Sequence, residues 1–457
     1  MTIDNLSKDQ FVARLGEVVS ASRPIRSFQR LKGREEDLFK IEKALTAPGR
    51  HVFIYGDRGV GKSSLAATAA YIYQSSDAPP IFVSGSVNDT FKTIVSNIVY
   101  QALRRSRTET KKSSSSLGFE WRGLKLGSST EVSWPDIANL IHSVGDAAEL
   151  LKEVETLYAE RPIVLIDEFD TIGDAEERGK FASLLKQLGD QDISLKFIFT
   201  GIGKSLDELL GAHQSAHRQL HTHELPKLPW DGRREIVESA AKEFNLSVHN
   251  DVIWRISAVC DGYPYYVHLI LEYMLWAAFE DDWEVDELDW THYHRGLRAA
   301  VDSINAELRK PYEQAVVHRD LEYEEVVWST ADHDDLFRAL PSMYESYRII
   351  NRKRGTLAAV DREQFSAMIR KLRSTSYGAI LQQEKPRLGW YSYREKMLRG
   401  YVRMQAAANG YELTGEREAP KQLMHMSSVR HGYRQGPSLP RGVRQNAAIR
   451  EPEKEKK

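Results

Sequence analysis

The sequence contains a single cysteine, Cys260, among its 457 residues. One cysteine excludes a disulfide bond within the chain and a structural zinc site built from four cysteines. Cys260 ends a helical pattern in "WRISAVCDGYP", where it is expected to be a small buried apolar side chain. Such sparse use of cysteine is typical of proteins in a reducing compartment.

The sequence also lacks a long apolar segment. Its most apolar stretch, residues 265–279, is shorter than a bilayer-spanning helix and contains His268 and Glu272. The first 22 residues do not combine a basic start with an apolar core, as a secretory signal would. We therefore expect a cytoplasmic protein without a membrane partner.

A strong excess of charge of one sign is absent as well. The 63 Lys and Arg residues are balanced by 65 Asp and Glu residues, so the formal net charge is -2. The chain as a whole is therefore not a polycation, and any surface for nucleic acid has to be local. The length predicts about three domains.

What is present is a glycine-rich loop between two regular segments. Residues 51–56, "HVFIYG", are apolar and β-branched, which predicts a buried strand, and residues 63–73 predict a helix. The stretch between them matches G-x-x-x-x-G-K-[ST], whose glycines allow backbone N–H groups to surround phosphate at a helix N-terminus. The alternative is a chance glycine-rich turn.

The loop therefore predicts ATP and Mg²⁺ as cofactors. Lys62 would reach the β- and γ-phosphates, and the Ser63 hydroxyl would bind the metal. The predicted cofactor-binding residues of the loop are Gly56, Asp57, Arg58, Gly59, Val60, Gly61, Lys62, Ser63 and Ser64.

Two further strands are expected to supply the catalytic groups. The apolar run 163–166 ends in Asp167 and Glu168, of which Asp167 would hold Mg²⁺ and Glu168 would activate water. A simpler role for this region is a helix N-cap after a core strand, supplied by Asp170 and Thr171. The strand 195–201 ends in Thr200, whose hydroxyl would position water near the γ-phosphate.

With these motifs the chain resembles the AAA+ and STAND ATPases, and within them the group similar to origin-recognition-complex ATPases. "LKGREED", residues 31–37, is similar to the family's Gly-Arg-Glu motif, and "DGYPYYVHLI", residues 261–270, is similar to the Gly-x-Pro motif of its helical lid. The resemblance implies that Gly33, Arg34 and Pro264 contact the nucleoside. It also implies that Arg218 acts on the γ-phosphate of a neighbouring subunit.

One departure from the family pattern favours the STAND side of the resemblance. The lid segment "GYPYYVHLILEY" lacks the arginine that senses the γ-phosphate in origin-recognition ATPases. Simpler roles also stay open for the family residues. Arg34 would form a surface ion pair with Glu35 or Glu36, Pro264 would begin a helix, and Arg218 would be an ordinary surface arginine.

The order of elements predicts an α/β fold, a P-loop NTPase parallel sheet with a helical lid, followed by an α+β winged helix-turn-helix domain. Its predicted parts are an N-terminal extension over residues 1–24, the ATPase domain over 25–229, the lid over 230–310, the winged helix over 311–410 and a disordered basic tail over 411–457. Residues 104–130 form a basic, serine-rich insertion, expected to be a flexible loop with a small hairpin.

The region predicted as a winged helix separates its charges. Residues 346–403 hold 14 Lys or Arg and 4 Asp or Glu, a net charge of +10, whereas residues 311–345 hold 2 and 9, a net charge of -7. This pattern predicts duplex DNA as a partner; the alternative is that the two halves pair with each other or with the ATPase domain. The candidate DNA-binding residues are Arg362, Arg370, Lys371 and Arg373 on the third helix, and Lys385 and Arg387 at the wing tip.

Two functions fit these features. The first is a DNA-associated ATPase whose turnover is slow or stimulated by a partner. The second is a STAND-type signalling or defence switch, in which the winged helix makes protein contacts, nucleotide exchange drives assembly as a homo-oligomer, and a separate protein acts as sensor or effector. A structural subunit with negligible turnover is a third option, opposed by the intact Lys62, Asp167 and Glu168.

Overall fold

The structure is a computed structural model of the chain. It describes residues 3–413 apart from residues 22, 75–78, 111–118, 122–123, 127–133, 159–160, 213–215, 318, 321, 356–357 and 385–386. One compact unit spans Met1–Glu416, and the other, Arg417–Lys457, lies outside the described residues. Lys385 and nearly all of the predicted tail also lie outside them.

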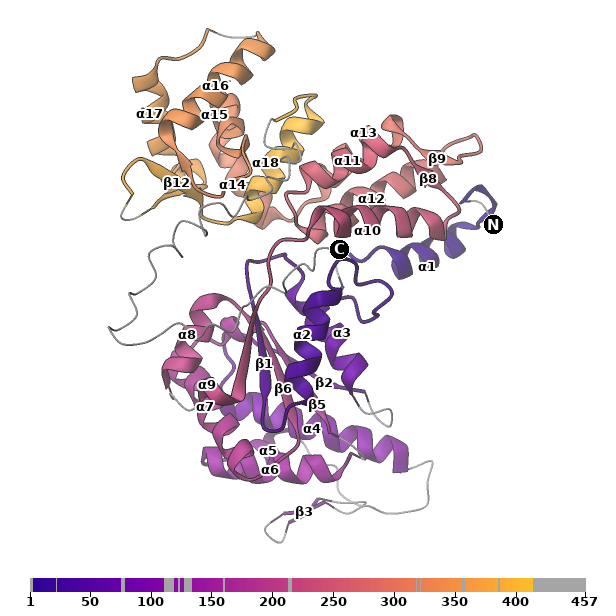
Figure 1. Cartoon of the computed structure of the whole chain (residues 1–457), viewed down its shortest axis with the longest axis vertical. Coiled ribbons are helices and arrows are strands. Elements are labelled where there is room, and N and C mark those ends of the chain that lie inside the picture. The colour runs from indigo at the N-terminus through magenta and orange to yellow at the C-terminus, as the bar shows by residue number, and fades with distance from the viewer. Residues whose placement is uncertain are drawn as a thin grey trace, which may run out of the picture. The chain divides into compact units, whose positions relative to one another are not determined.

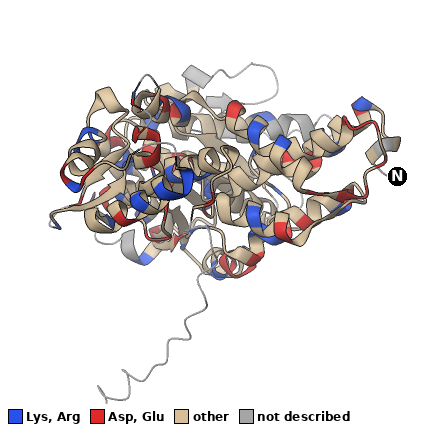
Figure 2. Cartoon of the chain, turned by 90° about the horizontal axis from the view of Figure 1, so that it is seen from above, with Lys and Arg blue, Asp and Glu red and all other residues tan. Residues whose placement is uncertain are grey.

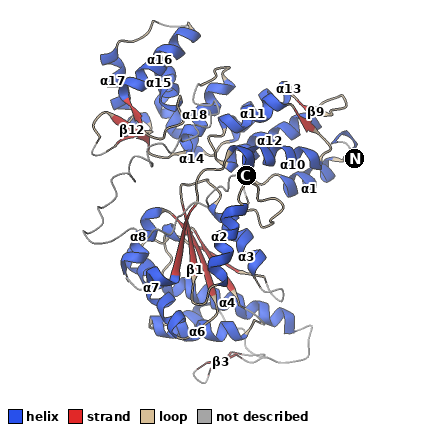
Figure 3. Cartoon of the chain, in the orientation of Figure 1, coloured by secondary structure: helices blue, strands red, loops and turns tan. Residues whose placement is uncertain are grey.

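A parallel five-stranded sheet forms the centre of the N-terminal α/β domain (Figures 1 and 3). Its strands lie in the order β2-β5-β6-β1-β7, with helices on both faces, which confirms the predicted α/β class. Because helices cover both faces, the strands are buried and their sequences are continuous apolar runs. The strands are β1 (His51–Tyr55), β2 (Ile81–Ser84), β5 (Ile163–Asp167), β6 (Lys196–Gly201) and β7 (Leu220–Glu224).

Alternate side chains of β1 contribute to two hydrophobic clusters. Val52 and Ile54 belong to the cluster that contains the buried faces of α2 and α3. Phe53 belongs to the other, where it packs edge-to-face on Phe169 with ring centroids 5.9 Å apart. The helices of the domain are α2 (Glu35–Thr46), α3 (Lys62–Tyr73), α4 (Phe91–Thr110), α5 (Trp134–Leu140), α6 (Val144–Thr156), α7 (Ala175–Asp190), α8 (Gly203–Ala212) and α9 (Ala216–Gln219).

The predicted insertion begins inside a helix. Residues 104–110 continue α4, so the first seven residues of the expected loop are helical instead. The small hairpin that was expected is present as the antiparallel pair β3 (Phe119–Trp121) and β4 (Leu124–Leu126).

The lid region is helical, and the N-terminal extension packs on it. Phe11 of α1 stacks on Phe279 with centroids 4.3 Å apart and meets Trp276 edge-on. The N-terminal segment therefore contributes to the lid core. The elements are η1 (Ile3–Asn5), α1 (Lys8–Val18), α10 (Trp230–Glu243), α11 (Asn250–Val259), α12 (Pro264–Phe279), α13 (Trp290–Ser303) and the parallel pair β8 (Ser247–Val248) and β9 (Glu287–Leu288).

The C-terminal region combines helices with a small antiparallel sheet in the order β10-β12-β11. The sequence of helices, hairpin and closing helix agrees with the predicted order, while the winged-helix assignment itself stays a prediction. The predicted boundary between residues 310 and 311 falls inside α14. The elements are α14 (Ala306–Val316), α15 (Glu322–Ala331), β10 (Arg338–Ala339), α16 (Leu340–Arg354), α17 (Arg362–Lys371), η3 (Thr375–Tyr377), β11 (Leu381–Gln383), β12 (Trp390–Tyr393) and α18 (Met397–Ala408).

Within the described part of the chain, the structure has no helix whose length and apolar character would suffice to cross a bilayer.

Candidate functional site

The glycine loop lies between β1 and α3, as predicted. Gly59 and Gly61 have φ angles of 77° and 99°, in the left-handed region that favours glycine, and Gly61 is the N-cap of α3. Lys62 Nζ donates hydrogen bonds to the carbonyl oxygens of Gly56 at 3.1 Å and Asp57 at 2.9 Å. Burial lowers the pKa of Lys62 below its usual value. The loop at the positive end of α3, with a lysine beside it, has the geometry of an anion site.

The polar groups predicted on the neighbouring strands meet at this loop. Ser63 Oγ donates a hydrogen bond to Asp167 Oδ1 at 2.9 Å, and the Thr200 hydroxyl bonds to the same carboxylate. The backbone N–H of Glu168 donates to Thr200 Oγ1 at 3.0 Å. These residues come together because β5 and β6 are adjacent parallel strands, so their carboxyl ends lie at the same edge of the sheet.

Glu168 has an unusual backbone conformation. Its φ of 53° lies in the left-handed region, which a non-glycine residue rarely adopts. The short helix η2 (Phe169–Thr171) follows, and the Thr171 N–H and hydroxyl both donate to Glu168 O. Strain of this kind is concentrated at functional sites.

The predicted helix cap at Asp170 was wrong, because Asp174 is the N-cap of α7 and accepts from Glu176 N at 2.8 Å.

A cavity of about 850 Å³ joins these groups. The side chains of Lys62, Glu168 and Asp170 all line it, so the cavity carries both a cation and carboxylates. The predicted site residues among its lining are Arg34, Arg58, Gly59, Val60, Gly61, Lys62, Ser63, Ser64, Glu168, Thr200 and Pro264. Predicted site residues outside its lining are Gly33, Gly56, Asp57, Asp167 and the exposed Arg218 of α9.

Arg34 braces the glycine loop. Its buried guanidinium donates to Val60 O at 3.0 Å and Pro226 O at 2.8 Å, and forms an ion pair with Asp37 at 3.3 Å. The surface ion pair with Glu35 or Glu36 that the sequence left open is therefore replaced by a buried one. Gly33 lies against α10, where an added Cβ would stand 2.7 Å from Gly232 Cα. Gly33 and Arg34 thus connect the glycine loop with α10 of the lid, and Arg34 also lines the cavity.

The lid wall of the cavity begins with Pro264, the first residue of α12. A Cβ built on Gly61 would lie 3.8 Å from the Pro264 ring, which places the proline beside the phosphate loop. His268, one turn further along α12, also lines the cavity, and burial lowers its pKa to about 4. The imidazole is therefore neutral near pH 7. Sequence reasoning assigned His268 no role, because it stands in an apolar helix without a motif.

The segment before α2 forms another wall that the sequence did not reveal. Ile25 N–H donates to Ser64 Oγ at 3.1 Å, and Thr68 Oγ1 donates to Ile25 O at 3.0 Å. Ser20 N–H reaches His268 Nδ1 at 3.5 Å. This segment therefore bridges α3 and α12 at the cavity.

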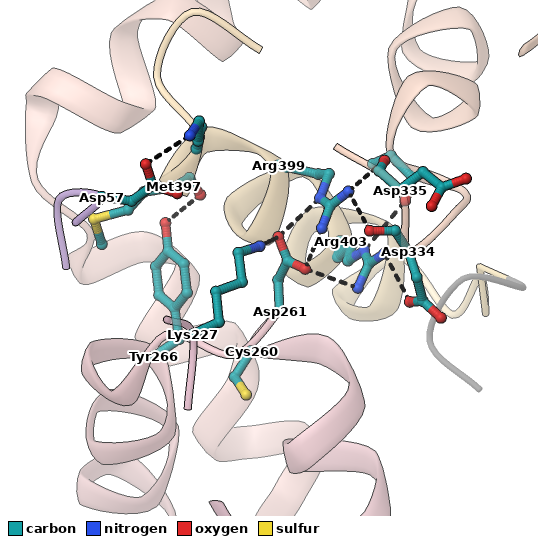
Figure 4. Close-up of polar contacts among 12 residues, drawn as sticks. Asp57, Lys227, Cys260, Asp261, Tyr266, Asp334, Asp335, Met397, Arg399 and Arg403 are labelled. Atoms are coloured by element: carbon teal, nitrogen blue, oxygen red, sulfur yellow. Dashed lines mark hydrogen bonds and ion pairs between the residues drawn. The ribbon is translucent and has the colours of Figure 1, made fainter. Parts of the chain in front are cut away.

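The start of α18 contacts the glycine loop directly (Figure 4). Lys396 Nζ and Asp57 Oδ1 are 2.6 Å apart, and the Met397 side chain lies against Gly59, leaving no room for a Cβ there. Tyr266 of α12 donates from its hydroxyl to Met397 O at 2.8 Å. Glu395 and Met397 line the cavity. Nothing in "YREKMLRGY" indicated this role, because the contact joins residues far apart in the sequence.

A buried ion cluster fixes α18 to the lid (Figure 4). Asp261 accepts from Arg399 at 2.7 and 2.9 Å, and lies 3.2 Å from Arg403 and 2.9 Å from Lys227. Burial alone would raise the pKa of Asp261, but Arg403, Arg399 and Lys227 outweigh it and hold that pKa well below its usual value. Burial also lowers the pKa of Lys227 to about 8. The carboxylate is thus ionised and fully surrounded by cations.

The candidate DNA-binding residues lie away from the cavity. Arg362, Arg370 and Lys371 are exposed on α17, and Arg373 follows it with a hydrogen bond to Gln383 at 2.9 Å. Arg387 is exposed on the β11–β12 hairpin, and Lys385 lies outside the described residues. Elsewhere Lys and Arg are interspersed with Asp and Glu (Figure 2), in keeping with the near-neutral net charge.

Comparison with known proteins gives one family and several similar structures. Residues 52–226 match the model of the ATPase family associated with various cellular activities (AAA). No curated protein matches the chain.

The similar solved structures have low sequence identity. The Walker-type ATPase paby2304 of Pyrococcus abyssi is 16% identical, with a TM-score of 0.48 over 84% of this chain and 99% of that one. Cdc6p from Pyrobaculum aerophilum is 16% identical, with a TM-score of 0.43 over 86% and 98%. The Aeropyrum pernix ORC1 protein, solved in complex with DNA, is 17% identical, with a TM-score of 0.41 over 82% and 92%.

No function follows from structural similarity with such low sequence identities and TM-scores. The family assignment rests on the matched segment, which contains the glycine loop, the Asp167–Glu168 strand and Thr200. Residues 52–226 of this chain are therefore similar to the AAA ATPases.

Proposed function

We propose that the chain binds and hydrolyses ATP with Mg²⁺, and that the state of the nucleotide controls its C-terminal region, residues 306–413. Lys62 would bind the β- and γ-phosphates, Glu168 would activate the attacking water, and Thr200 would hold Asp167 and the backbone of Glu168 in place. Arg34 and Pro264 would shape the nucleoside end of the cavity. The predicted action of Arg218 on a neighbouring subunit is part of this proposal and needs a homo-oligomer.

The residues fit a magnesium ion that arrives with the nucleotide. Among the described residues, no group of three or more His, Cys, Asp or Glu side chains is arranged to hold a metal. Mg²⁺ commonly binds through one or two protein oxygens together with substrate phosphates. Ser63 Oγ and Asp167 Oδ1, 2.9 Å apart, supply such a pair.

The contact between α18 and the glycine loop carries the proposed control. Met397 meets Gly59, Lys396 pairs with Asp57, and the same helix is anchored to the lid through Asp261. α18 also packs against α14 and α15 of the C-terminal region. A change at the phosphates would therefore act directly on α18, which is a helix of the C-terminal region.

We further propose that the C-terminal region binds duplex DNA through α17 and the β11–β12 hairpin. The exposed cations Arg362, Arg370, Lys371, Arg373 and Arg387 would neutralise phosphates. The test is the rate of ATP hydrolysis with and without duplex DNA at two salt concentrations. Stimulation that declines steeply with salt supports the proposal; no DNA binding at low salt overturns it.

The second candidate function is a switch whose C-terminal region makes protein contacts. The buried Asp261 cluster favours it, because a region held by fully desolvated ion pairs is suited to docking and release. On this view nucleotide exchange frees the region and promotes assembly, with a separate sensor or effector protein.

Light scattering of the protein with ADP and with a non-hydrolysable ATP analogue distinguishes the two functions: ATP-dependent assembly without DNA binding supports the switch. A cytoplasmic location stays a prediction for either function.

A further inference from the structure

Hydrogen bonds between nearly buried side chains lead from the edge strand β7 to the glycine loop. His223 Nε2 and Asp37 Oδ1 are 3.0 Å apart, and the other carboxylate oxygen, Oδ2, accepts from Arg34 Nη1 at 3.3 Å. Arg34 Nη2 donates in turn to Val60 O at 3.0 Å. The exposed fractions of the Arg34, Asp37 and His223 side chains are 4%, 14% and 8%, so water competes little for these bonds.

The charge of Asp37 fixes the direction of these bonds. Burial would raise the pKa of Asp37, but the hydrogen bond from His223 and the charge of Arg34 outweigh it and lower that pKa below its usual value. The ionised carboxylate only accepts, so His223 donates from Nε2 and Arg34 from Nη1. Because a guanidinium is planar and rigid, the bond at Nη1 also sets the direction of Nη2. Nη2 donates both to Val60 O and, at 2.8 Å, to Pro226 O.

The bond to Val60 orients a peptide group of the glycine loop. In a trans peptide the C=O and N–H point in opposite directions. The Val60 carbonyl faces Arg34, so the N–H of Gly61 points away from it. Gly61 lines the cavity, and backbone N–H groups surround the phosphates in this loop type. Glycine itself does little to hold this peptide, because it populates many backbone conformations.

We propose that Asp37 and His223 are positioning residues for the phosphate loop. They orient Arg34 so that the Val60–Gly61 peptide presents its N–H to the phosphates of the nucleotide. The inference rests on the proposed nucleotide function and adds two residues that hold the loop from outside the glycine motif. Since the peptide they orient belongs to the phosphate end of the site, binding of a polyphosphate without a nucleoside should depend on them too.

The test measures the affinity of the full chain for ADP and for pyrophosphate, with Mg²⁺, by competition with a fluorescent ADP analogue. His223→Leu removes the donor to Asp37 and should weaken both affinities by about tenfold. His223→Gln keeps an N–H donor on a side chain of similar reach and should restore both to within about twofold of wild type. Rescue by glutamine distinguishes the loss of this hydrogen bond from a general effect of replacing a buried histidine.

His221 provides a matched control on the same strand. Its ring stacks on that of His223 with centroids 6.5 Å apart, and among the described residues its Nε2 has no hydrogen-bond partner. His221→Leu therefore makes the same substitution without removing a bond to Asp37. It should leave both affinities within about twofold of wild type.

Two further measurements separate positioning from stability. Asp37→Asn should weaken pyrophosphate binding by about tenfold by itself, and His223→Leu in that background should add less than about twofold, because both residues act through Arg34. In steady-state hydrolysis, KM for ATP should rise while kcat stays within about twofold. The Gly61 N–H would bind phosphate equally in the ground state and the transition state, so its loss removes uniform binding.

Each other result has a defined meaning. The inference is overturned by wild-type pyrophosphate affinity in Asp37→Asn, by additive effects of the two substitutions, or by failure of His223→Gln to restore binding in a variant with the melting temperature of wild type. Loss of ADP affinity with unchanged pyrophosphate affinity would assign the residues to the nucleoside and overturn it as well. So would a wild type that binds ADP but not pyrophosphate, because the loop would then not hold phosphate by itself. Failure of wild type to bind either ligand would instead reject the proposed function.

Discussion

Lys396 and Asp57, 339 residues apart in the sequence, form an ion pair with Nζ and Oδ1 2.6 Å apart. The neighbouring loop residue Arg58 pairs with Glu307 of α14 at 2.9 Å. Adjacent residues of the phosphate loop are therefore held by two separate elements that follow the lid. Phosphates that enter or leave the loop would therefore lie beside residues held by both contacts.

Removing Lys396 should change nucleotide exchange more than stability. The side chains of Lys396 and Asp57 are 39% and 30% exposed, so the pair contributes at most about 1 kcal/mol to the free energy of unfolding. Lys396→Ala should therefore release a fluorescent ADP analogue about threefold to tenfold faster in stopped-flow experiments, with little change in melting temperature. Arg234→Ala, which breaks the exposed pair with Glu238, is the matched control and should leave the release rate unchanged.

The catalytic assignment predicts different effects for Lys62 and Glu168. Lys62→Ala should weaken ATP binding at least about tenfold, because the loop loses its only lysine, whereas Glu168→Gln should keep binding and lower kcat about a hundredfold or more. Calorimetry and phosphate release measure the two quantities. Lys40→Ala, at an exposed position of α2, controls for loss of a surface lysine. A normal kcat in Glu168→Gln would transfer the role to Asp170, which lines the same cavity.

Asp261 should be one of the most sensitive positions for stability. Asp261→Asn leaves Arg399, Arg403 and Lys227 buried without their carboxylate, which should lower the free energy of unfolding by about 3–5 kcal/mol. Urea denaturation measures the loss. Glu238→Gln, at a surface pair, should cost less than about 1 kcal/mol. Equal stability of Asp261→Asn and wild type would show that the cluster contributes nothing net.

The same residue predicts a pH dependence with a definite sign. The folded pKa of Asp261 is lower than the unfolded one, so its contribution to stability is fully present above the unfolded value of about 3.9. As pH falls below that value, the unfolded state takes up the proton first and this contribution is progressively lost. Stability measured between pH 3 and pH 6, a range chosen to span about one unit below and two above that value, should therefore fall less steeply in Asp261→Asn than in wild type.

Charge reversal on α17 tests the DNA surface. Arg370→Glu with Lys371→Glu should abolish DNA binding at low salt, because it replaces two phosphate contacts by repulsion, and should leave basal ATP hydrolysis nearly intact. Fluorescence anisotropy with a labelled duplex measures the binding. Lys40→Glu with Lys43→Glu, exposed on α2, makes the same charge change on another helix. If both double variants bind equally well, α17 is not the contact surface.

The local motifs were the predictable part of this chain. A strand, a glycine loop and a helix within residues 51–73 follow from hydrophobic pattern and backbone conformation alone, and the structure places Lys62, Ser63 and Asp167 together as expected. The sequence identified Thr200 as a residue that would position water, and the structure places its hydroxyl on the Asp167 carboxylate. Short-range preferences are sufficient here because each element carries its own signal for beginning and ending.

The walls of the cavity, and the contact of α18 with the glycine loop, are formed by segments that lie far apart in the sequence. The sequence suggested a surface residue or a nucleoside contact for Arg34, and only the structure shows that its guanidinium also donates to Val60 O and Pro226 O. Lys396 and Met397 carry no motif, and they contact the loop from α18, which Asp261 anchors to the lid. Contacts between residues that are hundreds of positions apart depend on how the domains pack together. No local sequence pattern within one segment indicates that packing.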